Sequence, residues 1–281
     1  MLADSFVGDF TFCRYGRIHT VVTRLHRKLR PFLHVDGEPV VNIDIANSQP
    51  LMVALLLTQY RRAGGRFFNM HTFGTDAETL YLPLSPAEPN AFAHAGSNST
   101  QKNTHRIGGC VGWGGVPAGL ASDEALYVRL CEGGELYEYL RQAAGLQHVQ
   151  QRAFKKRCFH DVFYGRNSVY TALTAAFERE FPNVWAVIRA AKRKDHVHLA
   201  RMMQTYESSL MINRVCRRLM DEYPDIPVIT LHDSILTTAA HVETVQRMIQ
   251  AEFADVGLSP KLKVERPAAV SGPAANTGVA A

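Results

Sequence analysis

The sequence predicts an α+β fold in which an antiparallel sheet packs against helices. The segment VNIDIANSQPLMVALLL, residues 41–57, alternates apolar and polar residues and becomes continuously apolar after Pro50, which is typical of a strand running into a helix. Near the other end, IPVITLHDSILTT, residues 226–238, contains two β-prone runs joined at Asp233-Ser234. This second pattern indicates a hairpin with an acidic residue at its tip.

The composition agrees with one large domain or two small ones. The chain has 281 residues, of which 46% are hydrophobic, and this is enough for a core. The apolar run 51–57 is far shorter than the roughly 20 residues of a spanning helix. Asp4 and Asp9 disagree with a signal peptide. We therefore expect no membrane association.

The number and spacing of the cysteines indicate the cellular compartment. There are five, widely scattered and without a CxxC pair. This distribution predicts a cytoplasmic protein with reduced thiols, and it disfavours a zinc site.

The charge points to a polyanionic partner. The formal net charge is +5, and the basic residues are clustered. The clusters are Arg24, Arg27, Lys28 and Arg30; Lys155, Lys156 and Arg157; Lys192, Arg193 and Lys194; and Arg214, Arg217 and Arg218. Solvated helix faces remain an equal alternative for them.

The first informative stretch is residues 16–33, where basic side chains alternate with apolar ones. Such a segment suits contact with a phosphate backbone while its apolar side anchors it. Asp36 and Gly37 then predict a turn, residues 40–45 a strand, and the run after Pro50 a helix to about Arg62.

Residues 63–122 break every period with Gly, Pro and Ser, which predicts an irregular peripheral insertion. Helical patterns resume at residue 123 and continue, with interruptions, to 223. The predicted helices are 147–164, 168–181, 184–194 and 196–223, followed after the hairpin by a helix at 241–256, a strand at LKVE and a flexible tail.

The helix at 147–164 carries a chemically distinctive row. Its members follow each other at spacings of four and therefore share one side of a helix: Arg152, Lys156, His160 and Tyr164. Such a row can grip a triphosphate and cover a base or sugar with its aromatic ring. The spacing alone favours an ordinary amphipathic surface helix.

Two carboxylates lie where strands end, Asp44 and Asp233. If their strands are neighbours in one sheet, the pair can hold two Mg²⁺ ions for in-line phosphoryl transfer. Taken singly, each aspartate is more often a turn or cap residue.

These three segments, in this order, resemble motifs A, B and C of the family A (DNA polymerase I-like) DNA polymerases, and less closely those of the phage-type single-subunit RNA polymerases. Asp44 matches motif A, and His232-Asp233-Ser234 matches motif C. The row that ends at Tyr164-Gly165 matches the nucleotide-binding helix of the fingers. Gly16-Arg17 and Gln204 resemble two further family positions.

The resemblance implies a right-hand polymerase with palm and helical fingers and a minimal or absent thumb. It implies palm at 1–62, the insertion at 63–122, fingers at 123–195, a second palm part at 196–266 and the tail at 267–281. The thumb precedes motif A in this family, so the few residues before Gly16 imply poor processivity unless a partner supplies a thumb or clamp.

The resemblance also implies residue roles in a DNA-directed DNA polymerase that extends a primer. Its partners would be primer-template nucleic acid and nucleoside triphosphates. Asp44, Asp233 and the backbone carbonyl of Ile45 would bind two Mg²⁺ ions. Arg152 and Lys156 would bind the triphosphate, and Lys156 would donate a proton to the departing pyrophosphate. Further contacts to the nucleotide would come from Gln49, His160 and Tyr164. Contacts to the nucleic acid would come from Arg17, Gln204 and His232.

Three departures keep alternatives open. Gln49 stands where the DNA enzymes have a glutamate that excludes the ribose 2′-hydroxyl, and Ser234 stands where many have glutamate. His160 replaces an aromatic Phe or Tyr. A primase-like or RNA-synthesising enzyme of the same fold, and an inactive nucleic-acid-binding relative, therefore remain alternatives.

Overall fold

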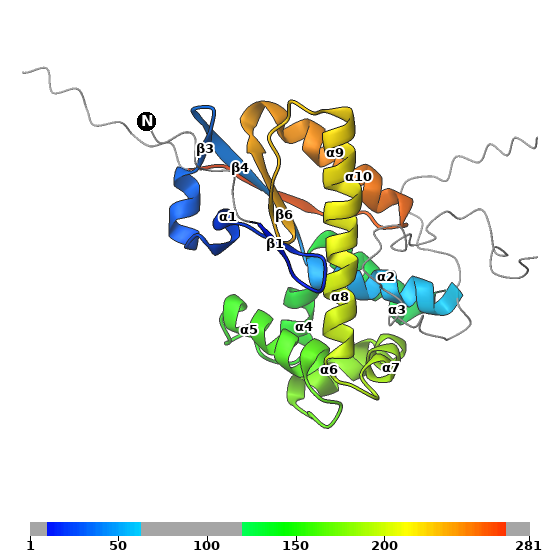
Figure 1. Cartoon of the computed structure of the whole chain (residues 1–281). Coiled ribbons are helices and arrows are strands. Elements are labelled where there is room, and N and C mark those ends of the chain that lie inside the picture. Colours follow the sequence, from blue (N-terminus) through cyan, green and yellow to red (C-terminus); the bar gives the residue numbers. More distant parts are fainter. Residues whose placement is uncertain (1–9, 63–119, 268–281) are drawn as a thin grey trace, which may run out of the picture. The chain divides into compact units, whose positions relative to one another are not determined.

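A computed structural model of the chain describes residues 10–62 and 120–267 (Figure 1). They form two compact units. Unit 1 comprises the described parts of Met1–Ser48, Gln204–Glu252 and Lys261–Ala281, and unit 2 those of Gln49–Met203 and Phe253–Pro260. Every described strand lies in unit 1, and unit 2 is helical. The predicted α+β class is therefore confirmed.

Unit 1 is organised around a five-stranded antiparallel sheet. Its strands are β3 (His34–Val35), β4 (Glu38–Ile45), β5 (Ile229–Leu231), β6 (Ser234–Thr238) and β7 (Leu262–Glu265). The order is β3-β4-β6-β5, and β7 pairs with β4. The predicted strand at 40–45, the hairpin and the LKVE strand are all confirmed.

The central strand β4 shows the alternation that its sequence predicts. Val41, Ile43 and Ile45 are buried at 2%, 0% and 2% exposure. Asn42 and Asp44, between them, are partly exposed. One face of β4 therefore belongs to the core, and the other presents polar groups. The turn before β4 has positive φ at Asp36 and Gly37, as a two-residue hairpin turn of the primed type requires.

The predicted long helix at 196–223 is continuous but not uniform. It consists of α8 (His198–Ser208), a π-helix η4 (Ser209–Cys216) and α9 (Arg217–Glu222), which follow one another directly. The predicted long helix is therefore confirmed in extent, and its middle third is a π-helix. The other large helix of this part of the chain, α10 (Val242–Asp255), agrees with its prediction.

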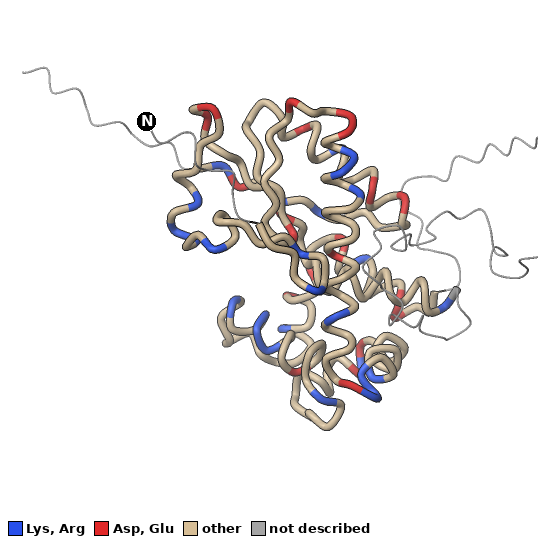
Figure 2. Tube along the Cα trace, viewed as in Figure 1, with Lys and Arg blue, Asp and Glu red and all other residues tan. Residues whose placement is uncertain are grey.

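The N-terminal part of unit 1 contains short elements that the sequence did not predict individually. They are β1 (Thr11–Phe12), β2 (Ile18–His19), α1 (Val21–Arg24) and the 3₁₀-helix η1 (Arg27–Phe32). Figure 2 shows Lys and Arg gathered along α1 and η1.

The expected anchoring of residues 16–33 by their apolar side is met only in part, because the apolar side chains of η1 face solvent. Leu29 and Phe32 are exposed at 52% and 64%. Since side chains three residues apart eclipse in a 3₁₀-helix, the two share one solvent-facing edge. Leu33 and Val35 make the anchoring contact instead, against the buried cluster that includes Val40.

Unit 2 contains seven elements in its described part. These are α2 (Ser48–Arg62, from Gln49), α3 (Ser122–Gly133), α4 (Leu136–Ala143), α5 (Gln151–Arg157), the π-helix η3 (Cys158–Tyr164), α6 (Ala172–Glu180) and α7 (Pro182–Ala191), followed by the first part of α8. Its core holds a cluster of aromatic rings that meet edge-on or tilted, from Tyr127, Phe177, Phe181 and Trp185.

Several helix starts differ from prediction for local reasons. The helix α2 begins two residues before Pro50, because the first amides of a helix have no intrahelical partner and a proline costs little there. The helix α6 begins at Ala172 rather than 168, because the Thr171 side chain caps it by accepting from the Thr174 amide at 3.3 Å. Residues 63–119 of the predicted insertion at 63–122 lie outside the described residues, as do residues 268–281 of the predicted tail at 267–281.

Within the described residues, no helix combines the length and the apolar character needed to cross a membrane. The cysteines in this part of the chain, Cys13, Cys131, Cys158 and Cys216, are free thiols.

Candidate active site

The register of β4 against β6 brings the two predicted aspartates to one place in unit 1. Asp44 lies opposite Ser234 in the ladder. Asp233 directly precedes Ser234 in the hairpin loop, and the Ile45 amide donates to the Asp233 carbonyl at 3.3 Å. Two carboxylates far apart in sequence therefore lie at neighbouring strand ends. The sequence alone could not show that the two strands are neighbours.

The backbone beside each aspartate adopts a left-handed conformation. Asn47, shortly after β4, has φ +56°, and His232, at the hairpin tip, has φ +57°. Asn and His are among the non-glycine residues that tolerate this region best. Because β5 and β6 pair at Leu231 and Ser234, only His232 and Asp233 form the loop. This tight turn holds Asp233 at the edge of the sheet.

The electrostatics show that negative charge is concentrated here. Burial, together with the neighbouring carboxylates of Glu207 and Asp44, raises the pKa of Asp233 to about 7. Arg17 offsets part of this effect. Carboxylates that repel each other in this way favour either a shared proton or a bound cation.

Glu207 is a site residue that the sequence analysis did not select. It is 2% exposed, accepts from the Ser48 hydroxyl at 2.7 Å and forms an ion pair with Arg17. The available sequence indication was its position three residues after Gln204, which places both on one side of α8. Gln204 itself is partly buried.

Arg17 and His232, both predicted to contact nucleic acid, do lie in this region. The ring of His232 meets that of His19 edge-on, with centroids 5.9 Å apart. Partial burial lowers the pKa of His232, and the charges of Arg17, His19 and Arg30 lower it further, against the opposing effect of Glu207. A cluster of basic side chains therefore adjoins the carboxylates.

Neither models of known protein families nor curated proteins yield a match to this chain.

The predicted nucleotide-binding row lies in unit 2. Arg152 and Lys156 are exposed on α5, His160 is exposed on η3, and Tyr164 is partly buried. In a π-helix a step of four residues falls short of a full turn, whereas in an α-helix it slightly overshoots one. Because the π-helix begins at Cys158, the two opposite offsets compensate, and His160 and Tyr164 stay on the same side of the helix as Arg152 and Lys156.

The end of the row is tied to Gln49, the predicted sugar-selecting residue. The Tyr164 hydroxyl donates to Gln49 Oε1 at 3.3 Å, and Gln49 is 9% exposed. Gly165, next to Tyr164, approaches the backbone so closely that a Cβ there would lie 2.3 Å from the His160 carbonyl oxygen. Only glycine fits that position, which accounts for the Tyr-Gly pair.

His160 is oriented by a buried carboxylate that the sequence did not single out. Its Nδ1 lies 2.8 Å from Asp161 Oδ1, and the Thr171 hydroxyl donates to the other carboxylate oxygen at 3.1 Å. Asp161 is 7% exposed. The imidazole therefore keeps Nε2 available on the exposed side.

The donor set of unit 1 fits magnesium. No group of three or more His, Cys, Asp or Glu side chains suited to a metal occurs among the described residues. Magnesium, however, is commonly held by one or two carboxylates together with substrate phosphates and water. Asp44 and Asp233, with the Ile45 carbonyl, match that requirement in kind.

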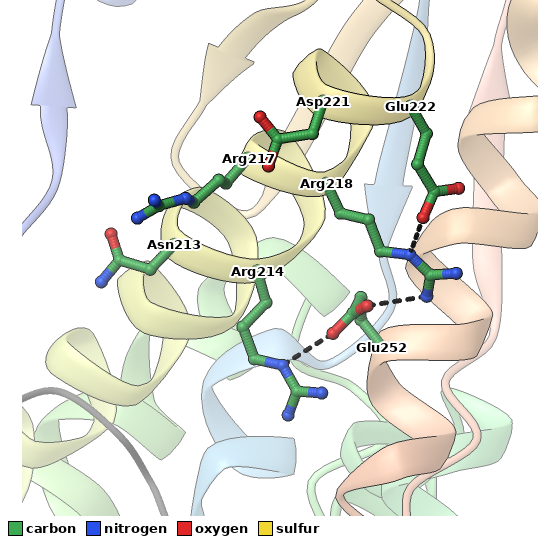
Figure 3. A pocket seen from close by; sticks show the side chains of 7 residues that line it. All are labelled: Asn213, Arg214, Arg217, Arg218, Asp221, Glu222 and Glu252. Carbon is green, nitrogen blue, oxygen red and sulfur yellow. Dashed lines mark hydrogen bonds and ion pairs between the residues drawn. The ribbon is translucent and has the colours of Figure 1, made fainter.

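A pocket of about 280 Å³ in unit 1 has a different character (Figure 3). It is lined by Asn213, Arg214, Arg217, Arg218, Asp221, Glu222 and Glu252. Arg214 and Arg218 both bind Glu252, at 2.6 and 2.9 Å. Two of the basic side chains in this predicted cluster are therefore already neutralised, and no predicted site residue lines the pocket.

Proposed function

We propose that this chain is a DNA-directed DNA polymerase of the family A type, which adds nucleotides to a primer 3′-hydroxyl. The observation that carries the proposal is the position of Asp44, opposite Ser234 in the ladder, next to Asp233, which directly precedes β6, with the pKa of Asp233 raised by burial and by neighbouring carboxylates. Unit 1 would correspond to the palm and unit 2 to the fingers.

Asp44, Asp233 and the Ile45 carbonyl would hold two Mg²⁺ ions. When bound, the ions would activate the primer hydroxyl and neutralise charge on the phosphates. The residues themselves supply fixed, partly buried oxygen ligands. Their mutual repulsion, seen in the raised pKa of Asp233, would be relieved by the cations.

The remaining groups would bind and position the substrates. Arg152 and Lys156 would hold the triphosphate, and Lys156 would donate a proton to the departing pyrophosphate oxygen. Tyr164 would stack near the templating base. Arg17, Gln204 and His232 would contact the primer end or the template.

Primer extension with Mg²⁺ tests the proposal directly. Wild-type protein should lengthen a labelled primer on a template. Asp233→Asn should remove incorporation while binding of primed DNA is nearly retained, because the amide keeps the shape and loses the charge. Asp225→Asn is the matched control, since it removes an exposed carboxylate of unit 1. Extension by Asp233→Asn at the wild-type rate would refute the two-metal assignment.

RNA synthesis is a second candidate because of one contact. The Gln49 carboxamide accepts from the Tyr164 hydroxyl at 3.3 Å at the position that would govern sugar choice. A neutral amide there excludes a ribose 2′-hydroxyl less strongly than a carboxylate does. Incorporation of dNTPs and rNTPs on one primed template separates the candidates, and equal use would contradict the preference for DNA synthesis. Gln49→Glu should shift selection toward dNTPs.

The inactive alternative predicts a different outcome from both. A relative that only binds nucleic acid would retain primed DNA and incorporate neither kind of nucleotide at any Mg²⁺ concentration. Retention of both aspartates and Lys156 supports turnover, because binding alone does not require that set.

A further inference from the structure

Arg30 has a buried donor that the protein leaves unused. It lies on η1, is partly buried, and its Nε is enclosed without a hydrogen-bond partner in the described structure. An enclosed donor without a partner is unfavourable, so such a group in a folded protein calls for an explanation. Arg17 shows the same feature, because its Nε is also enclosed and unpaired.

Both guanidinium groups belong to the surroundings of the hairpin tip. Within unit 1, η1 packs against β4 and α1 packs against β5, the strand that leads into His232. The His19 ring touches the His232 ring. The charges of Arg17, His19 and Arg30 all act on His232. The donors therefore converge beside the residue that precedes Asp233.

The nearby carboxylate of Glu207 is already bound by other residues. Both oxygens of Glu207 are engaged, one by Arg17 and one by the Ser48 hydroxyl. Elsewhere in unit 1 the buried acid Glu252 satisfies two arginines at once. Among the described residues, no acid forms a hydrogen bond or an ion pair with Arg30, so its Nε is open to an acceptor from a ligand.

We infer that Arg30, the Nε of Arg17 and His19 form a binding site for a phosphate group next to the candidate catalytic carboxylates. Guanidinium and imidazole groups together present several N–H donors, and a phosphate supplies the several anionic oxygens that such a set requires. The inference rests on the proposed function in taking the phosphate from nucleic acid or from a nucleoside triphosphate. It adds two residues, His19 and Arg30, to those predicted to bind substrate.

Binding without catalysis tests the site. Anisotropy of labelled primed DNA would be measured in chelator, with Arg30→Gln compared with Lys28→Gln. Both changes remove one positive charge from η1, but Lys28 is exposed. Arg30→Gln should weaken binding of the phosphate ligand about tenfold, as expected for a hydrogen bond to a charged group. Lys28→Gln should have a clearly smaller effect.

Two arms identify the source of the phosphate. In the first, single methylphosphonate linkages replace successive primer phosphates. One of them should weaken wild-type binding and leave Arg30→Gln unaffected, if the site holds a backbone phosphate. In the second, binding of a labelled nucleoside triphosphate is measured without DNA. Selective weakening of that binding by Arg30→Gln assigns the site to the triphosphate.

Equal effects of Arg30→Gln and Lys28→Gln in both arms would overturn the inference. His19→Gln provides an independent check and should weaken the same ligand, with thermal unfolding confirming that each variant is folded. The outcome is separable from the proposed function. A protein that extends primers but shows no Arg30 effect lacks this site, whereas a protein that shows the Arg30 effect without extension binds phosphate but is not a polymerase.

Discussion

The helix α5 and the continuous helix formed by η4 and α9 carry basic residues at the same spacing and use them differently. Arg152 and Lys156, four residues apart on α5, are exposed and form no ion pair with any residue that the structure describes. Arg214 and Arg218, also four apart, both bind the buried carboxylate of Glu252. Figure 3 shows the two arginines converging on that acid.

The difference shows that basic spacing alone does not reveal which cations are available to a substrate. Glu252 lies on α10, far along the chain from the arginines that it neutralises. Its 5% exposure makes it a structural acid that stabilises the packing of α10 against the preceding helix. Arg152 and Lys156 on α5 have no such acid among the described residues and can receive an external anion.

The largest effect should come from Lys156. Lys156→Ala should cost on the order of 2.7–4 kcal/mol of transition-state stabilisation, by analogy with removal of one preorganised electrostatic contact. Single-turnover primer extension measures it. Lys155→Ala is the matched control on the same helix, because Lys155 instead lies over the Tyr137 ring at 5.1 Å. Equal rate losses in the two variants would break the contrast between substrate-binding and structural cations.

Glu252→Gln should affect stability and leave the rate of folded protein unchanged. The variant weakens two charge-assisted hydrogen bonds, and since both arginines are partly exposed, we expect a loss of about 1–3 kcal/mol in the free energy of unfolding. Urea unfolding measures this loss. Glu243→Gln, an exposed change on α10, should be nearly silent. If Glu252→Gln lost activity without losing stability, Arg214 and Arg218 would instead be substrate-binding residues.

Salt dependence provides a finer comparison of the two helices. Binding of primed DNA should weaken steeply as salt rises, because basic side chains displace counterions from phosphates. Arg152→Gln should reduce the slope of log affinity against log salt by about 1. Arg218→Gln should leave the slope unchanged, since its charge is already paired. A flat response in the wild-type protein would exclude the nucleic-acid partner altogether.

Lys192 is neither exposed like Lys156 nor paired with an acid like Arg218, because it is buried. Its substitution should have the smallest effect of those considered. It is 3% exposed, donates to the Val162 carbonyl at 2.6 Å and lies over the Trp185 ring. It is therefore not part of a solvated face, although the sequence places it in a basic cluster. Burial lowers its pKa from 10.5 to about 8, with a further contribution from Arg189.

The lowered pKa predicts the direction of a pH effect. Below pH 8 the folded and unfolded chains both carry the proton, and the burial penalty is fully present. Between pH 8 and 10.5 only the folded chain has released it, so stability should rise with pH relative to Lys192→Met. Urea unfolding of both proteins across this range measures the difference. A constant difference would mean that Lys192 is not desolvated.

The local sequence patterns predicted which helices and strands exist more reliably than the residues at which they begin and end. Alternation identified β4, and turn residues identified the hairpin that presents Asp233. The π-helices η3 and η4 were not predictable, because their residues also suit a regular α-helix and only packing selects the wider turn. The exposure of Leu29 and Phe32 was not predictable either. Apolar side chains favour burial, but whether they are buried depends on the tertiary contacts around them.

The sequence by itself determined the strand that carries Asp44, the hairpin that carries Asp233 and the order of the basic row, because turn chemistry and side-chain periodicity are local properties. Tertiary structure alone decided that Asp44 lies opposite Ser234, that Glu207 holds Arg17, and that Arg30 is left without an acid. These are pairings between residues far apart in the chain. Strand register and helix packing set them, and neither is encoded in any single segment.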